Sequence, residues 1–164
     1  MKELYVVRHA KSSWDNPQQT DFERPLNERG KNDADLMSKK LQEYSILPDY
    51  ILCSNAKRTR QTLKRLLKNM PVSEDRIEYK NELYLASAQT LSLEISKLSD
   101  KYNKVMVIAH NPGVTDFTNY LLGENIVNFP TLGIAFLELP IDSWQETASR
   151  IAVLRHFLYP KMFK

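Results

Sequence analysis

The sequence predicts an α/β fold, a three-layer α/β/α sandwich built around a mostly parallel central sheet. Short apolar runs alternate with segments of helical periodicity, which is typical of βαβ units. The runs at 4–7, 50–53 and 105–109 are continuously apolar, as expected of strands that are buried on both faces. Each run leads into polar residues, and ligands bind beside the carboxyl ends of such strands. A single binding crevice at one edge of the sheet is therefore expected.

Composition limits the class of protein. The 164 residues are enough for one domain with a full core, and a single domain over 1–164 is expected. The net charge of +3 is far from the clustered charge of a nucleic-acid binder. Apolar runs stay well short of the ~18 residues that span a bilayer. We expect no nucleic-acid or membrane partner. One cysteine and a strand within three residues of Met1 favour a cytoplasmic protein without a signal peptide.

The first half of the chain is expected to alternate strands with helices. Pro17 and Pro25 interrupt the polar segment after the first strand, so a loop is expected there. Ala34, Met37 and Leu41 recur at helical spacing and give the next helix one apolar face. In order, we expect a strand at 3–7, a loop at 11–27, a helix at 28–44, a strand at 50–53, and a helix capped by Ser54 or Asn55 that ends near 68.

The second half repeats this alternation and then changes direction. Asn111 is a favoured N-cap, Pro112 suits the first helical position, and Gly123 suits the end of that helix. A polar turn between the last two strands favours an antiparallel hairpin at the sheet edge, and the tail from Tyr159 is expected to fray. The expected elements are strands at 76–79, 104–109, 134–139 and 151–154, and helices at 88–98 and from 112 to 122.

Four side chains at strand ends form the candidate site. His9 and His110 each follow a strand, and Arg8 precedes His9. Arg58 falls in the first turn of the helix after the second strand, where backbone N–H groups also favour an anion. The planar donors of arginine match phosphate oxygens, and histidine is an established covalent catalyst. If the strand ends lie side by side, the cluster predicts a phosphoryl-transfer site.

Each candidate has an assigned role and a plainer alternative. Neighbouring cations lower the pKa of an imidazole, so His9 would stay neutral and nucleophilic; alternatively, the backbone satisfies it. His110 would donate to a phosphoryl oxygen, since no histidine spacing suits a metal. Glu82 would protonate the leaving oxygen, or it is an exposed loop residue. Ser12 would hydrogen-bond the phosphate, or it is an ordinary loop serine. We expect no metal and no organic cofactor.

Other residues are assigned structural roles. Cys53 precedes Arg58 by four intervening residues and Arg60 by six, whereas a cysteine phosphatase needs five, so Cys53 is expected to be a buried hydrophobe. His156 has no apparent partner in the sequence and is expected to be structural. The remaining basic residues of the helix after the second strand are expected to face solvent.

Several segments between residues 3 and about 140 carry a recognisable combination of motifs. They are Arg8-His9-Ala10, Asp21 with Arg24-Pro25-Leu26, Arg29-Gly30 with Asp33-Ala34, Pro48 to Leu52, Ser54 to Thr62, and Ala109-His110-Asn111-Pro112. Together they resemble the histidine phosphatase superfamily, which is phosphoglycerate mutase-like, and most of all its short phosphohistidine phosphatase branch, the SixA type. Arg8-His9-Ala10 is similar to the Arg-His-Gly signature of the superfamily, with alanine in place of glycine. The resemblance implies a phosphate pocket of Arg8, His9, Arg58 and His110. Glu82 falls where many members of the superfamily keep a proton donor.

The function that follows is an expectation of the residues and the resemblance together. We expect a metal-independent phosphatase that works through a phosphohistidine intermediate on His9. Its substrate would be a phosphohistidine protein or a small phosphate ester, because the chain lacks the large insertions that close over the substrate in mutases. A phosphoglycerate-type mutase and a non-catalytic phosphate- or phosphopeptide-binding module are the alternatives. The sequence leaves the oligomeric state open.

Overall fold

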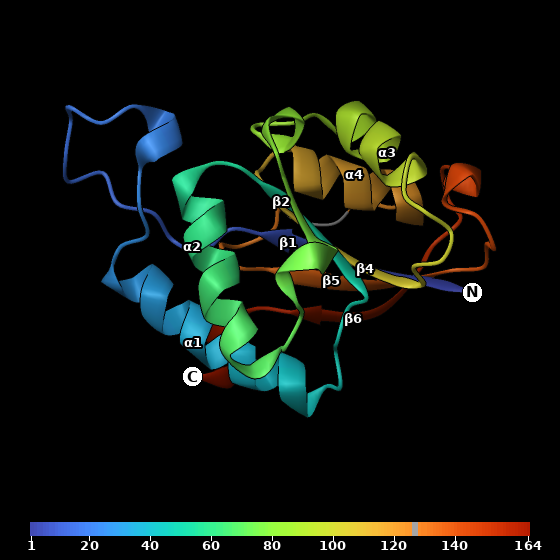
Figure 1. Ribbon diagram of the computed structural model, residues 1–164, viewed down its shortest axis with the longest axis horizontal. Coiled ribbons are helices and arrows are strands. Elements are labelled where there is room, and N and C mark those ends of the chain that lie inside the picture. The colour runs from blue at the N-terminus through green and yellow to red at the C-terminus, as the bar shows by residue number, and fades with distance from the viewer. Residues whose placement is uncertain (126–127) are drawn as a thin grey trace.

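A single six-stranded mixed sheet forms the centre of the molecule in the computed structural model, which describes residues 1–125 and 128–164 (Figure 1). The strand order is β3-β2-β4-β1-β5-β6, and the first four of these are parallel. β5 and β6 run antiparallel at one edge. The expected mostly parallel sheet with an antiparallel hairpin at its edge is therefore confirmed. The strands are β1 (Lys2–Arg8), β2 (Tyr50–Ser54), β3 (Ile77–Lys80), β4 (Lys104–Ala109), β5 (Ile134–Leu139) and β6 (Val153–Leu158).

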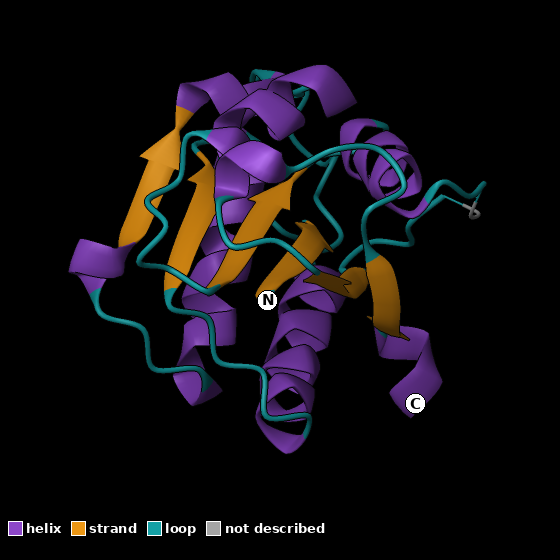
Figure 2. Ribbon diagram, turned by 90° about the vertical axis from the view of Figure 1, so that its right-hand side faces the viewer, coloured by secondary structure: helices purple, strands orange, loops and turns teal. Residues whose placement is uncertain are grey.

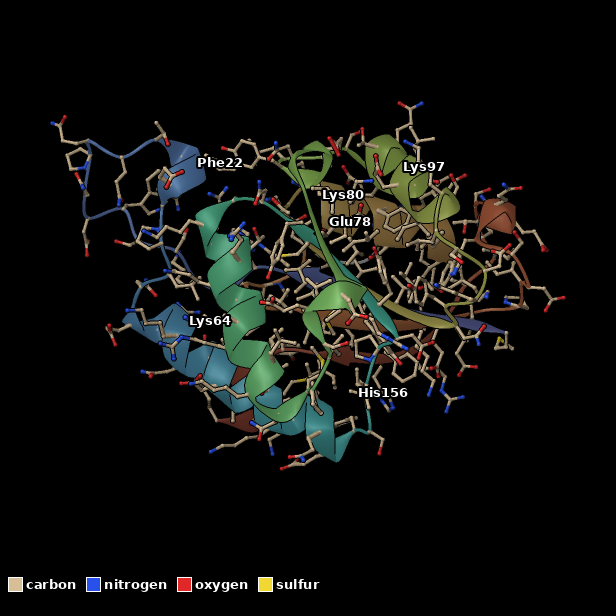
Figure 3. The ribbon with its side chains drawn as sticks, viewed as in Figure 1. Phe22, Lys64, Glu78, Lys80, Lys97 and His156 are labelled. Atoms are coloured by element: carbon tan, nitrogen blue, oxygen red, sulfur yellow. The ribbon has the colours of Figure 1, made fainter. Side chains whose placement is uncertain are left out.

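Helices cover both faces of this sheet and make the three expected layers (Figure 2). α1 and α2 pack on one face, and α3 and α4 on the other. The helices are α1 (Glu28–Glu43), α2 (Lys57–Leu66), α3 (Ala88–Ser96) and α4 (Gly113–Leu122), with short 3-10 turns that include η1 (Asp21–Glu23), η4 (Asn81–Leu83) and η6 (Pro160–Phe163). On the outer face of α2, Lys64 is exposed, as the sequence predicts for the basic residues of this helix (Figure 3).

The side chains of β1 point alternately to the two faces of the sheet, so this strand contributes to both apolar cores. Leu4 and Val6 belong to the apolar cluster under α3 and α4, whereas Tyr5 and Val7 belong to the cluster under α1 and α2. All four are buried, because successive side chains of a strand point to opposite faces. Burial of both faces leaves the carboxyl end of the strand as its accessible part, and Arg8 and His9 follow there.

Both predicted N-caps beside the site are wrong. The N-cap of α2 is Ala56, which has no capping side chain, because the Ser54 hydroxyl is engaged by His110 and Asn55 bonds to Arg60 and Asn81. The N-cap of α4 is Pro112 rather than Asn111. The Asn111 side chain instead accepts from the Thr115 hydroxyl and donates to the Phe129 carbonyl. In each case a polar side chain is used for tertiary contacts near the site.

The end of the chain also differs from expectation. β6 begins at Val153 and continues to Leu158, where Leu158 pairs with Ile134, so the last strand lies several residues later than predicted. The tail does not fray. It forms η6, Pro160 is buried, and the Lys164 ammonium lies 2.7 Å from the Asp33 carboxylate. These contacts bring the C-terminal segment against α1 (Figure 1).

Backbone hydrogen bonds on both sides hold the end of β1 in place. The His9 N–H donates to the Ala109 carbonyl of β4, and the His9 carbonyl accepts from the Leu132 N–H ahead of β5. The next N–H, of Ala10, donates to the Thr62 hydroxyl of α2 over 3.0 Å. The backbone around His9 is thus fixed by three separate parts of the chain.

We predict that Gly30→Ala destabilises the protein although the position is helical. A Cβ atom at Gly30 would overlap the Lys11 carbonyl oxygen, so α1 or the loop after His9 must move. We expect a loss of about 1–3 kcal/mol in the free energy of unfolding, typical of overpacking. In urea denaturation the control Asn32→Ala, at an exposed site of the same helix, is expected to leave stability unchanged or slightly higher. Equal stability of the two variants would contradict the close approach.

Candidate active site

The carboxyl ends of β1 and β4 and the first turn of α2 bring three predicted side chains together. The ring centroids of His9 and His110 are 5.3 Å apart. The Arg58 Nε–H donates to His9 Nε2 over 3.3 Å. All three side chains are buried, although they are separated by about fifty residues at each step along the chain. This juxtaposition follows from β1 and β4 being neighbours and α2 starting directly after β2.

Hydrogen bonding fixes the tautomer of His9. Its Nδ1 lies 2.7 Å from the Ala10 carbonyl oxygen, which is an acceptor only, so Nδ1 carries the proton. Nε2 therefore presents a lone pair, and this lone pair accepts from Arg58. A neutral imidazole with a directed lone pair is the form that attacks an electrophile.

His110 is oriented by a serine that sequence reasoning did not select as a site residue. The Ser54 hydroxyl lies 2.7 Å from His110 Nε2, and it also accepts from the Ala56 N–H. With the Ala56 N–H donating to it, the hydroxyl donates its own proton to Nε2. The hydroxyl proton has no other acceptor among the described residues, so Nε2 accepts it and His110 Nδ1 carries the N–H, which is buried without a protein partner. A buried donor without a partner is suited to an anion that enters the site.

Both imidazoles are held neutral. Burial is the main cause that lowers the pKa of His9 to about 3, and Arg58, Arg8 and Arg24 lower it further against the Ala10 hydrogen bond. Burial likewise lowers the pKa of His110 to about 3, aided by His9 and Arg58. The expectation that neighbouring arginines keep His9 unprotonated has the right direction, but desolvation contributes more than charge.

Asp21 is the counter-ion of this cluster. Its carboxylate accepts from Arg58 Nη2 at 3.0 Å and from Arg24 Nη1 at 2.8 Å, and its backbone carbonyl accepts from Arg58 Nη1 at 2.7 Å. The Tyr84 hydroxyl also donates to it. Partial burial acts to raise the pKa of Asp21, but the hydrogen bonds from Tyr84, Arg24 and Arg58 outweigh it and lower the pKa to about 2. Asp21 is therefore ionised at neutral pH.

Aromatic rings link the loop that carries Asp21 to the opposite side of the site. The Tyr84 ring meets His110 edge to face, with centroids 5.4 Å apart, and lies against the Arg58 guanidinium. Phe22 of η1, which is labelled in Figure 3, meets the Tyr84 ring edge to face, with centroids 4.9 Å apart. η1 and the segment after η4 thus join across the start of α2.

The other predicted residues lie farther from this cluster or are already engaged. Arg8 donates to the Phe129 carbonyl over 2.8 Å, and its Nε is buried without a partner. The Ser12 hydroxyl is buried and accepts from Arg24. Glu82 is exposed in η4, two residues before Tyr84, and makes no ion pair among the described residues. No hydrogen bond or ion pair joins Glu82 to His9 or His110 in the part of the chain that the structure describes.

Sequence reasoning missed Asp21, Tyr84 and Ser54 as site residues. Asp21 and Ser54 lie within segments on which the family resemblance depends. The resemblance therefore pointed to both residues, but it did not assign either of them a function in the site. Tyr84 offered no signal, because its contact with Asp21 spans 63 residues and depends on the loop conformation.

The structure also tests two other kinds of chemistry, a cysteine nucleophile and a metal site. Cys53 is buried, its thiol donates to the Ser54 carbonyl, and burial raises its pKa, so it is not a thiolate nucleophile. The prediction that Cys53 is a small buried residue is confirmed. Within residues 1–125 and 128–164, no group of three or more His, Cys, Asp or Glu is placed to hold a metal ion. None of the helices described there is long and apolar enough to cross a bilayer.

Comparison with known proteins identifies the family. Residues 4–83 match the family model of the histidine phosphatase superfamily, branch 1. A chloroplastic protein of Arabidopsis thaliana is 32% identical over 153 residues, which cover 88% of this chain and 70% of the relative. A Mycobacterium tuberculosis protein is 31% identical over 165 residues, covering 94% of this chain and all of the relative. Both relatives are uncharacterised.

The chain belongs to the histidine phosphatase superfamily. A solved structure assigned as the phosphohistidine phosphatase SixA of Agrobacterium tumefaciens is 30% identical, with a TM-score of 0.83 and coverage of 97% of this chain and 98% of that one. A SixA structure in complex with tungstate shares the fold, with 23% identity, a TM-score of 0.85 and coverage of 99% of both chains. The chain is thus a phosphatase of the SixA-type branch, with the phosphoglycerate mutase-like fold and no large insertions, as the sequence predicts.

We predict that His9 and His110 of this phosphatase stay uncharged to about pH 4. Because their pKa values are about 3, ¹⁵N NMR should show neutral rings there, with His9 protonated on Nδ1. The unfolded chain takes up these protons near pH 6.5, so stability is full above pH 6.5 and falls between pH 6.5 and 3, by up to ~1.4 kcal/mol per pH unit for each ring. Rings that titrate near 6.5 in the folded protein would contradict this account.

We also predict that Ser54→Ala lowers kcat by about tenfold to a hundredfold without loss of the fold. The variant removes the partner that sets the His110 tautomer, and losing such a buried hydrogen bond costs ~1–3 kcal/mol. The His110 ¹⁵N shifts should then show a mixture of tautomers. Ser38→Ala is the control, since the Ser38 hydroxyl is equally buried but bonds to the Leu66 carbonyl away from the site. Equal kcat values for the two variants would argue against a role for Ser54.

Proposed function

We propose that this phosphatase hydrolyses phosphoramidates, phosphohistidine in proteins foremost, in two steps through a phosphoryl group carried on His9. The observation that carries the proposal is the directed Nε2 lone pair of a neutral, buried His9 beside Arg58. Arg8, Arg58 and His110 hold the phosphoryl oxygens. Ser12 contributes through its bond to Arg24, which supports the loop at the edge of the site.

In the first step, His9 Nε2 attacks phosphorus in line. A bond forms between Nε2 and phosphorus, the bond from phosphorus to the substrate nitrogen breaks, and its electron pair leaves with that nitrogen. The positive charge that develops on the His9 ring is shared with the Ala10 carbonyl through the Nδ1 proton. His110 donates its Nδ1–H to an equatorial oxygen, where charge accumulates.

In the second step, water attacks the phosphorus of phospho-His9. The bond between phosphorus and Nε2 breaks, its electron pair returns to Nε2, and the water protons remain on the phosphate and the solvent. His9 is thereby restored to the neutral form in which it began. Positioning and charge stabilisation are the main contributions asked of the protein in both steps.

The ionised state of Asp21 favours a phosphoramidate substrate over an alkyl phosphate ester. Its low pKa keeps it ionised, so it is a poor proton donor to a leaving alkoxide. A protonated phosphohistidine ring carries a positive charge before it leaves, and a carboxylate beside the phosphate site favours that charge. The relative that binds tungstate, an oxyanion with the charge of a phosphate dianion, supports phosphoryl binding in the same fold.

The alternatives are less well supported. A mutase must retain its substrate for a second transfer, and the chain has none of the large insertions that would close over it. A pure binding module needs donors but no free nucleophile, so the directed lone pair of His9 would have no purpose. The proposal includes a cytoplasmic location, which suits the free thiol of Cys53.

We expect His9→Ala to abolish turnover of phosphohistidine peptides, by at least about a thousandfold, because the nucleophile is absent. Binding of tungstate should persist, because Arg8, Arg58 and His110 remain. Phosphate release and calorimetric titration measure the two properties separately. His156→Ala is the control, since His156 of β6 packs against Tyr44 and Phe136 and not against the candidate site. Activity that survives in His9→Ala would exclude covalent catalysis by this residue.

Glu82 provides a second test, through the leaving group. If Glu82 serves as a proton donor, it does so for esters, which leave as poor alkoxides, and not for protonated phosphohistidine. We expect Glu82→Gln to lower kcat on an alkyl phosphate by about tenfold or more. On phosphohistidine the same variant should retain at least half of the wild-type kcat. The reverse pattern, with phosphohistidine hydrolysis lost and ester hydrolysis kept, would contradict the phosphoramidate assignment.

A further inference from the structure

A cavity that includes Arg8 of the candidate site is lined largely by positively charged side chains. It has a volume of about 620 Å³ and shares Arg8 with the phosphoryl site. Four separate segments form it: the end of β1 with the loop that follows His9, the first turns of α1, the turn before β5, and η6 at the end of the chain. Among the described residues that line it, the charged ones are Arg8, Lys11, Arg29, Lys161, Lys164 and the acidic Asp33.

The positive charge in this cavity is only partly neutralised. Asp33 is buried and pairs with the Lys164 ammonium at 2.7 Å, and more distantly with Arg29 at 3.7 Å. Lys11 and Lys161 have no carboxylate partner among the described residues, and the Arg8 Nε is buried without any acceptor. A concave surface with unpaired cations attracts anions more strongly than the same charges on a flat, solvated face.

Size and position narrow the choice of anion. The cavity lies within the 300–1,000 Å³ of sites that hold drug-sized ligands, so a lone phosphate would leave most of it empty. Its lining includes Arg8, the chain neighbour of His9 and one of the residues assigned to hold the phosphoryl group, so an occupant of the cavity would lie next to the group being dephosphorylated. Two or three residues of an extended peptide next to the phosphorylated residue would fit this description.

We propose that the cavity binds acidic side chains that flank the phosphorylated residue of a protein substrate. The proposal rests on the proposed function and adds a sequence preference to it. Lys11 and Lys161 are the specificity-determining residues, and they contact the flank rather than the reacting atoms. Arg8 joins the two subsites, and Asp33 positions Lys164 and Arg29.

The test is fluorescence anisotropy of labelled peptides that carry a stable triazole analogue of phosphohistidine, flanked by either glutamates or glutamines. We expect the glutamate peptide to bind the wild-type protein about tenfold more tightly at low salt, with a smaller gap at high salt. Lys11→Gln/Lys161→Gln should reduce the gap to less than about twofold and leave the glutamine peptide unchanged. Lys39→Gln/Lys64→Gln, which removes two exposed lysines outside the cavity, should keep the tenfold gap.

Two outcomes would overturn the proposal: no preference for the glutamate peptide in the wild-type protein, or an equal loss of that preference in both double variants. Failure of the proposed function is recognised separately with phosphoimidazole, which has no flank. If phosphoimidazole is hydrolysed but no acid preference exists, the catalytic proposal stands and the cavity proposal falls. If phosphoimidazole is inert but phosphotyrosine peptides show the same acid preference, the cavity proposal stands and the phosphoramidate proposal falls.

Discussion

The contact between the Arg58 guanidinium and the His9 imidazole is the interaction on which the rest of the site depends. Arg58 donates to the one nitrogen of His9 that lacks a proton, and both side chains are buried. This geometry requires α2 to begin directly after β2 and the loop after β1 to be tied to α2. The bond from the Ala10 N–H to Thr62 supplies that tie. The sheet order and the start of α2 therefore matter to the chemistry as much as the histidine itself.

Charge balance explains why such a site suits a phosphoryl group. Arg58, Arg8 and Arg24 lie close enough to His9 to lower its pKa. The Asp21 carboxylate accepts hydrogen bonds from two of these arginines, Arg24 and Arg58. Burial penalises any additional proton, so the imidazoles remain neutral and the excess positive charge stays on the arginines. A dianion that enters supplies the missing negative charge, and His110 Nδ1 and Arg8 Nε gain the acceptors that they lack.

The sequence was sufficient for the layers, the sheet and the meeting of Arg58, His9 and His110, because continuous apolar strands and their polar ends are local signals. The caps at Ser54 and Asn111 were predicted wrongly, since capping propensity is a local preference and tertiary partners claimed both side chains. The Asp21–Tyr84 contact and the ordered tail could not be predicted from the sequence for the same reason. Each depends on residues that only the folded chain brings together.

The central claim is that the Nε2 atom of His9 accepts the phosphoryl group, and the most direct measurement is to trap and locate it. The wild-type enzyme is mixed with ³²P-labelled phosphohistidine protein, quenched in alkali within milliseconds, digested and mapped. The account predicts an acid-labile label on the His9 peptide with phosphorus bonded to Nε2, because Nδ1 is occupied by its bond to the Ala10 carbonyl. Label on Nδ1, on another residue, or on no residue during active turnover would contradict it.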